Sequence, residues 1–234
     1  MVLASGSNTH RILLGTSTSS DLLFEFDAGG EFQWEPAYSI APTNSAPILR
    51  QHEGEREFEI AKWGFRPSWA KAGGPPRINA RLETVATNGL FRGAFAGSRC
   101  IVPMSGYYEW EEVEDGKQPY FISSRATVLA AAGLQAAYKD ENDEWRSTFT
   151  IITREAKDAS GEIHDRMPVF LEPEMFDRWI SAEKIEHKDA MLHELDETSA
   201  AVAATITTRP VSRAVNNVRK LDRTDASLIE PITL

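Results

Sequence analysis

The sequence has only one cysteine, Cys100, among its 234 residues. An intramolecular disulfide is therefore excluded, and a zinc site built on cysteines is not expected. Apolar runs are also short: the most apolar stretch, residues 128–137, cannot cross a bilayer. The first residues lack the apolar core of a secretory signal peptide. We therefore expect a cytoplasmic protein that does not enter a membrane.

Basic residues are fewer than acidic ones, with 25 Lys and Arg against 35 Asp and Glu, a net charge of −10 at pH 7. This balance argues against a protein that coats nucleic acid with its whole surface. The charge is unevenly distributed, however. Residues 61–110 carry seven basic and two acidic residues, a net charge of +5, whereas residues 111–234 carry −9. The basic window is either a solvated face or a local groove that binds an anion.

No repeat, low-complexity tract or evident linker divides the chain, so we expect one domain. Turn residues and hydrophobic periodicity predict a small set of elements. These are a capped helix from Ser19-Ser20-Asp21, a turn at Asp115-Gly116, strands over 120–124, 127–132, 147–153 and 202–207, a loop over 139–144, and helices over 173–179 and 184–195. Because strands outnumber helices and come in runs, we expect an α+β fold, mainly antiparallel sheet or open β-barrel with a few flanking helices.

Two segments of the basic window combine residue types that suit nucleic acid. Residues 63–69 hold two tryptophans around Gly and Pro, and are either a core anchor or a stacking platform for bases beside Arg66 and Lys71. In the second segment, alternation along an extended chain places Arg77, Asn79 and Arg81 on one face. Such a polar row would suit a phosphodiester backbone.

Two further segments hold candidate proton-transfer groups. Glu109 stands among three aromatic residues in 106–110; burial would make it a candidate general acid or base, whereas on an exposed strand face it would point outward. His164 follows the loop 158–162, and His is the side chain best suited to proton transfer near neutral pH, although a loop His is commonly structural. No metal-ligand spacing, phosphate-binding glycine loop or nucleophile elbow is present, so neither metal nor cofactor is expected.

Seven short motifs occur in order along the chain. They are YSIAPT (38–43), KWGF (62–65), INARLET (78–84), RCIVP (99–103), GYYEW (106–110), TIIT (150–153) and IHDRMP (163–168). This series strongly resembles the SOS-response-associated peptidase (SRAP) family of abasic site processing proteins, over about residues 11–231. The resemblance implies a single SRAP-like domain over 11–234, preceded by an N-terminal extension, 1–10, that lies outside the family pattern.

The resemblance also implies a function in DNA repair. Members bind single-stranded DNA at an abasic site, where the amine of an N-terminal Cys forms a Schiff base with the sugar aldehyde and its thiol closes a thiazolidine cross-link. Abasic-site lyase and N-terminal autopeptidase activities are implied as well, in a monomer without metal or cofactor. The catalytic positions correspond to Asn79, Glu109 and His164. The expected DNA contacts, with Arg77 added from the polar row, are Arg11, Pro42, Trp69, Arg77, Arg81, Thr153 and Arg166.

The sequence departs from the family pattern at the nucleophile. Arg11 corresponds to the Arg of the family's initial Met-Cys-Gly-Arg, so that Thr9-His10 stands in place of Cys-Gly. Cys100 belongs to an internal motif and does not substitute, and a Thr hydroxyl is a much poorer nucleophile than a thiol. We therefore expect that covalent cross-linking is lost or altered. Two alternatives are a non-enzymatic single-stranded DNA-binding module, and a hydrolase unrelated to DNA with Cys100 as nucleophile and His164 as base.

Overall fold

The larger of two sheets closes on itself as a five-stranded ring. The computed structural model describes residues 11–70, 74–124, 128–156, 161, 163–217 and 221–234. The strands of the ring are β3 (Ser45–His52), β4 (Glu55–Trp63), β6 (Arg99–Met104), β9 (Leu129–Lys139) and β10 (Trp145–Glu155). They pair in the order β10–β4–β3–β6–β9, and β9 pairs again with β10. Only the β10–β4 pair of this ring is parallel.

Two short strands lengthen the sheet along β10. β5 (Asn79–Arg81) pairs with β10 in parallel, beyond the end of β4 on the same edge. β11 (Arg166–Pro168) pairs antiparallel on the other edge, beyond the end of β9. Strand β10 therefore has partners on both edges along most of its length.

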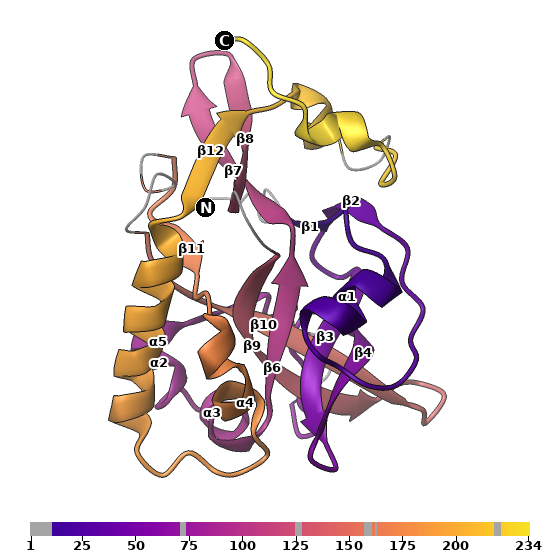
Figure 1. Cartoon of the computed structure of the whole chain (residues 1–234), viewed down its shortest axis with the longest axis vertical. Coiled ribbons are helices and arrows are strands. Elements are labelled where there is room, and N and C mark those ends of the chain that lie inside the picture. Colours follow the sequence, from indigo (N-terminus) through magenta and orange to yellow (C-terminus); the bar gives the residue numbers. More distant parts are fainter. Residues whose placement is uncertain (1–10, 71–73, 125–127, 157–160, 162, 218–220) are drawn as a thin grey trace.

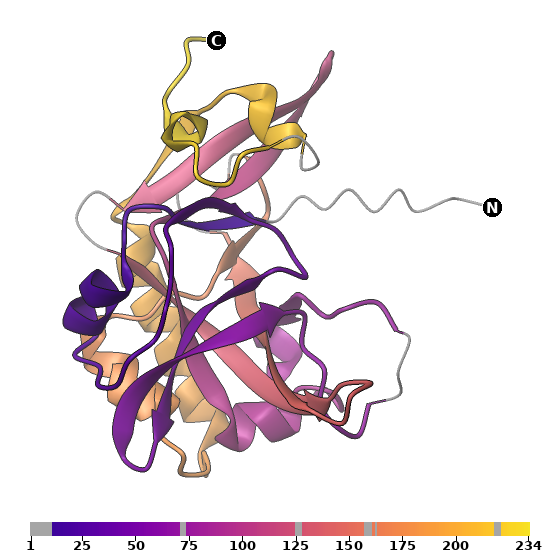
Figure 2. The ribbon, with the colours of Figure 1, turned by 90° about the vertical axis from the view of Figure 1, so that its right-hand side faces the viewer.

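The second sheet is entirely antiparallel, in the order β12 (Ile206–Pro210), β8 (Gly116–Ser124), β7 (Gly106–Val113), β1 (Arg11–Leu14) and β2 (Ala37–Ile40). Ser105 alone separates β6 from β7, so one chain segment passes directly between the sheets. The C-terminal turns η3 (Arg213–Asn216) and η4 (Ala226–Ile229) lie against the β7–β8 hairpin (Figures 1 and 2). They cover a small apolar core of Leu13, Tyr108, Trp110, Phe121, Val211, Val215 and Leu228.

Short helices cover the ring. α2 (Leu82–Val85), α3 (Arg92–Gly97), η2 (Pro173–Met175), α4 (Phe176–Ile180) and α5 (Lys188–Ala203) gather at one end of the molecule (Figure 1). α1 (Ser19–Glu25) lies next to α4, because the ring of Phe26, which caps α1, stacks on Phe176 at 5.4 Å. The predicted capped helix is present: α1 begins at Ser19 with a capping box in which Thr18 and Asp21 exchange hydrogen bonds. Among the described residues, no helix is both long and apolar enough to cross a membrane.

The predicted α+β class, single domain and mainly antiparallel sheet are confirmed. Most predicted strands are present but longer than expected, as β8, β9 and β10, although Thr127 lies outside the described residues. The predicted turn before Gly116 joins β7 to β8, and Gly116 has a φ of +133°. The predicted loop is the turn after Lys139, where the Asp140 carboxylate accepts the N–H groups of Asn142 and Glu144. The helix predicted from Pro173 consists of η2 followed by α4.

The longest helix begins later than the predicted start at residue 184. Arg99 is the reason, because its buried guanidinium donates to the carbonyl oxygens of Trp179, Ser181 and Glu183. These bonds hold the segment before α5 as a loop, and Ile185 N–H adds a bond to Ala96 O at 3.0 Å. The helix is therefore free to start only at Lys188.

The same helix also extends past the predicted end at residue 195. The buried hydroxyls of Thr198 and Ser199 accept the backbone N–H groups of Glu172 and Phe170, at 2.9 and 3.2 Å. These contacts stabilise the helix as far as Ala203. The predicted start of the last strand at residue 202 is therefore wrong, and the observed strand β12 spans Ile206–Pro210. Neither contact can be recognised from local periodicity.

We predict that Gly106→Ala destabilises the fold by about 1–3 kcal/mol. A Cβ at Gly106 would lie 2.4 Å from Ile122 O and 2.5 Å from the Phe121 ring, and the β8 backbone would have to shift. The measurement is the free energy of unfolding in urea. Gly93→Ala in α3, where nothing lies within 4 Å of a new Cβ, is the matched control and should be neutral or slightly stabilising. Equal unfolding free energies for the two variants would contradict the prediction.

Candidate functional site

A narrow cavity of about 30 Å³ lies where the two sheets meet. Side chains of β1 and β7 from the second sheet and of β4, β5, β10 and β11 from the first line it. Five of the residues expected from the sequence are among them: Arg11, Asn79, Glu109, Thr153 and Arg166. They lie far apart in the chain, and strand pairing along β10 and between β1 and β7 brings them together.

The alternation predicted for the polar row is present in β5. Ala80 is 1% exposed and packs inward, while the half-buried Asn79 and the exposed Arg81 flank it. Asn79 lies opposite Ile151 and Arg81 opposite Thr153 on β10. The Asn79 side chain lines the cavity, and its amide group offers two donors and one acceptor for a ligand there.

Glu109 is a buried carboxylate, only 3% exposed, in the middle of β7. The interpretation that it points outward to solvent is therefore wrong. Its neighbours Tyr108 and Trp110 lie on the opposite face of the strand and belong to the small core under the C-terminal turns. A carboxylate removed from bulk water beside a polar cavity can exchange a proton with a group held there.

Arg166 is fixed by a forked ion pair at the edge of the cavity. Its two terminal nitrogens bond the two carboxylate oxygens of Glu83 at 2.6 and 3.0 Å, and one also donates to Thr153 O at 2.7 Å. Hydrogen bonding to Arg166 lowers the pKa of Glu83 below its ordinary value. This geometry leaves the guanidinium in one orientation, with the cation presented to the cavity.

Arg11 is held from the other side by the C-terminal segment. Its guanidinium lies 5.3 Å above the Trp110 ring and donates to Val215 O. The Trp110 indole N–H in turn donates to Asn216 Oδ1 at 2.6 Å. Arg11 is 3% exposed, and burial lowers its pKa from the ordinary value. The turn η3 therefore positions a cation in the cavity although no residue of η3 lines it.

His164 lies in the turn before β11 and is not part of the cavity lining. Its Nδ1 accepts the backbone N–H of Arg166 at 3.0 Å, so the neutral ring carries its proton on Nε2. The loop expected before it falls largely outside the described residues. His164 is only two residues from Arg166 of the cavity lining, but its own side chain is not part of that lining.

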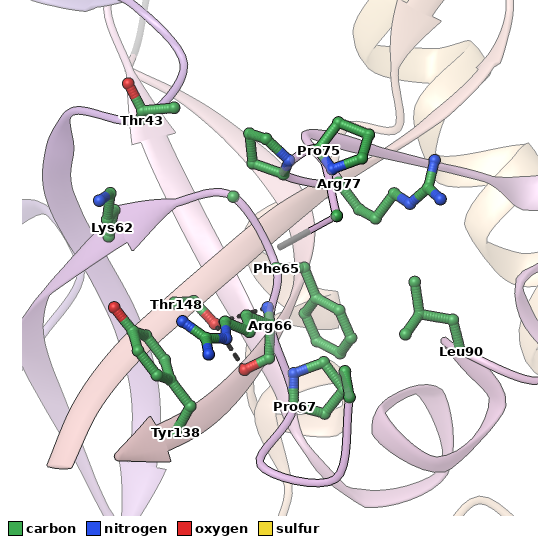
Figure 3. A pocket seen from close by; sticks show the side chains of 14 residues that line it. Thr43, Lys62, Phe65, Arg66, Pro67, Pro75, Arg77, Leu90, Tyr138 and Thr148 are labelled. Carbon is green, nitrogen blue, oxygen red and sulfur yellow. Dashed lines mark hydrogen bonds between the residues drawn. The ribbon is translucent and has the colours of Figure 1, made fainter. Parts of the chain in front are cut away.

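Figure 3 shows a second, larger pocket of about 390 Å³, whose lining residue Gly64 directly follows Trp63 of the cavity in the chain. Arg77 lines it, two residues before Asn79. Pro42 is buried next to Thr43, another lining residue. The segment 63–69 combines both predicted possibilities: Trp63 is a core anchor at 1% exposure, whereas Trp69 is 66% exposed and lines a neighbouring hollow. Lys71 lies outside the described residues.

Three contributors to these sites escape reasoning from the sequence: Glu83, Asn216 and Tyr138. Glu83 is part of the motif over 78–84, but nothing in the motif indicates its pairing with Arg166. Asn216 and Tyr138 act through contacts with residues far away in the sequence. Among the described residues, no three His, Cys, Asp or Glu side chains gather as metal ligands do.

The barrel, the second sheet and the cavity between them define an α+β protein that holds a polar site with two fixed cations beside a cationic pocket. The family profile described as SOS response associated peptidase (SRAP) matches residues 11–218, and the chain belongs to this family. The profile begins at Arg11, the first residue of β1.

Two curated relatives are both described as abasic site processing proteins. The chain is 33% identical over 198 residues to abasic site processing protein YedK of Escherichia coli (strain K12), covering 83% of this chain and 84% of that protein. It is 30% identical over 227 residues to abasic site processing protein HMCES of Gallus gallus, covering 81% of this chain and 65% of that longer protein. A crystal structure of a Bacteroides thetaiotaomicron protein superposes with a TM-score of 0.75 at 19% identity, over 96% of this chain and 100% of that one, and shows the shared fold.

We predict that Cys100 does not react with thiol reagents at neutral pH in the folded protein. The side chain is 0% exposed in β6, and burial raises the pKa of the thiol, so almost no thiolate forms. The measurement is the rate of reaction with a chromogenic disulfide, with one thiol per chain released in guanidinium chloride as the control. Rapid reaction of the native protein would restore the hypothesis of a Cys100 hydrolase, which its burial otherwise contradicts.

Proposed function

We propose that this protein recognises abasic sites in single-stranded DNA and acts on their ring-opened sugar. The observation that carries the proposal is the convergence of Arg11, Asn79, Glu109, Thr153 and Arg166 on one cavity. These residues come from five separate strands, and no requirement of core packing explains such a set of polar groups. The names of the E. coli and chicken relatives support the same substrate.

The cavity suits a sugar without a base. It is narrow, at about 30 Å³, and five polar side chains line it, so it suits the thin, hydroxyl-bearing chain of a ring-opened sugar better than the wider ring of a nucleobase. The Asn79 amide would bond a sugar hydroxyl, and the cations of Arg11 and Arg166 would attract the adjoining phosphates. Intact nucleotides would therefore be disfavoured by size and abasic ones retained.

Two groups are proposed to move protons in this site. Glu109 would accept or donate a proton at the sugar carbon chain, because it is a carboxylate enclosed beside the cavity. His164 would exchange a proton with the sugar oxygen through Nε2, provided that DNA binding brings the sugar toward the turn before β11. The remaining contacts to the strand are proposed at Pro42, Trp69, Arg77, Arg81 and Thr153.

Covalent capture through a thiazolidine is proposed to be absent. The reaction needs an accessible thiol next to an amine, and the one thiol of this sequence, Cys100, is buried in β6. Thr9-His10, which precede Arg11, lie outside the described residues, and a hydroxyl would close the corresponding ring far less readily. Residues 11–234 are proposed as the SRAP domain and 1–10 as an extension to it. Lyase chemistry remains part of the proposal, and N-terminal autopeptidase activity does not.

The protein is further proposed to work as a monomer in the cytoplasm, associated with the nucleoid when it is bound to DNA. The proposed mechanism uses acid–base groups and cations of this chain and requires neither a metal nor a cofactor.

We predict that the protein binds abasic single-stranded DNA more tightly than intact or duplex DNA, and that Arg81→Ala weakens this binding. Removing one phosphate contact should also lower the dependence of log Kd on log salt by about one unit. Fluorescence anisotropy across a salt series measures both quantities. Arg178→Ala in α4, which removes the same charge at 58% side-chain exposure, is the matched control and should bind as the wild type does. Equal affinity for the three DNA forms would contradict the proposal.

We predict that incubation with abasic DNA gives cleavage at the lesion without a heat-stable protein–DNA band, and that Glu109→Gln slows cleavage by about 100-fold or more. The substitution keeps the shape of the side chain but removes its ability to transfer a proton. A denaturing gel and the intact mass of the protein report cleavage and covalent capture together. A stable adduct would overturn the proposed loss of capture. Cleavage no faster than in buffer, or unchanged in the variant, would instead support the non-enzymatic binding module.

A further inference from the structure

We propose that the larger pocket binds the nucleobase of the nucleotide directly flanking the abasic sugar. This inference rests on the proposed function and extends it from the lesion to its neighbour. At about 390 Å³ the pocket has the volume of a small-ligand site, and it is more than ten times larger than the adjoining cavity. The two hollows would therefore divide one strand, with the baseless sugar in the narrow one and a base in the wide one.

The charge of the pocket identifies the class of ligand. The described residues of its lining include three cations, Lys62, Arg66 and Arg77, and none of these lining residues carries a carboxylate. This concentration stands out in a chain with a net charge of −10. Cations gathered in a concave surface focus their potential on an anion held there, as a phosphodiester would be. In Figure 3 the side chains of Lys62 and Arg77 lie on opposite sides of the pocket, as two successive phosphates would require.

A flat stacking surface stands between these cations. The Arg66 guanidinium lies 4.3 Å above the ring of Tyr138, which comes from the end of β9. A guanidinium plane and an aromatic ring are the two protein groups on which bases stack regardless of sequence. The pocket would therefore accept any of the four bases, as a protein that meets lesions in arbitrary sequence must.

The stacking surface is rigid before any ligand arrives. The backbone N–H of Arg66 donates to Thr148 Oγ1 at 3.0 Å, and Thr148 Oγ1 donates to Ala136 O at 2.9 Å. Three prolines, Pro67, Pro75 and Pro76, stiffen the wall. Gly64 lets the backbone pack closely against Pro76, because a Cβ at residue 64 would lie 2.8 Å from Pro76 Cβ. The φ of +148° at Gly64 also disfavours other residues. A preorganised site loses little entropy on binding.

The pocket and the cavity are consecutive along the same strands. Trp63 lines the cavity and Gly64 the pocket, and likewise Asn79 lines the cavity and Arg77 the pocket. Two residues of extended chain span about 6.6 Å, a step comparable with that from one nucleotide to the next in an extended strand. A strand whose baseless sugar enters the cavity would therefore bring a neighbouring base to the Arg66–Tyr138 pair.

The test compares Tyr138→Ala with the wild type on three oligonucleotides. The first has a single stable abasic analogue, and the other two carry a second base-free spacer immediately 5′ or 3′ of it. We expect that one of the two spacers weakens wild-type binding about five- to a hundredfold, and that Tyr138→Ala weakens binding of the first oligonucleotide by a similar factor. In Tyr138→Ala the same spacer should cause no further loss of affinity. Removing the base and removing the Tyr138 ring abolish the same stacking contact, so the two effects should not add.

Two control variants separate stacking from general damage. Tyr138→Phe keeps the ring and should bind as the wild type does. Trp145→Ala removes an aromatic side chain that is 62% exposed on the same hairpin but does not line the pocket, and it should have no effect. Thermal unfolding of each variant shows that the fold is retained.

The outcomes distinguish this inference from the proposed function. If Tyr138→Ala binds abasic DNA as tightly as the wild type, or if neither spacer affects the wild type, the base pocket is overturned and abasic recognition stands. If the wild type shows no preference for abasic DNA, the proposed function fails, and the effect of Tyr138→Ala on intact single strands still decides whether the pocket binds bases. Absence of any binding to single strands overturns both.

Discussion

Strand β10 must satisfy its backbone hydrogen bonds on both edges, and the site follows from the way it does so. One edge pairs with β4 and then β5, and the other with β9 and then β11. The first partners on each side close the ring, while the second ones place Asn79 opposite Ile151 on one edge and Arg166 opposite Glu155 on the other. Buried N–H and C=O groups cannot be left unpaired without a large cost, so the closure of the barrel and the assembly of the cavity are one event.

Buried and half-buried guanidinium groups hold the parts of the molecule together, and each has a different set of partners. Arg99 bonds only to carbonyl oxygens and fixes a loop, whereas Arg166 is paired with Glu83 and faces the cavity. Because the pKa of Glu83 is lowered in the folded protein, this pair stabilises the fold above the ordinary carboxyl pKa and is lost as the pH falls through the lowered value. Arg11 contacts the Trp110 ring and donates to one carbonyl oxygen, and burial lowers the pKa of its guanidinium.

An acidic protein can present a basic site because electrostatic potential is local. The acidic residues concentrate after residue 110, where many lie on exposed turns and on the surface of α5. The cations of the two hollows come from the first part of the chain, apart from Arg166. The net charge of the whole chain therefore argues against a protein that coats DNA with its entire surface. The positive charge of residues 61–110, in contrast, indicates the cations that line the larger pocket. Long-range repulsion between the acidic surface and a DNA strand would restrict the proposed contact to the region of these cations.

The sequence by itself determined the fold class, the alternation that presents Asn79 and Arg81, and the motif residues that gather in the cavity, because strand periodicity and residue chemistry are local properties. Only the tertiary structure decided the bounds of α5, the burial of Glu109, the ion pair of Arg166 with Glu83 and the place of His164 outside the lining. The stacking pair of Arg66 and Tyr138 likewise joins residues 72 positions apart. Such contacts depend on which strands pair and in what register, and that choice is made by the packing of the whole chain rather than by any one segment of it.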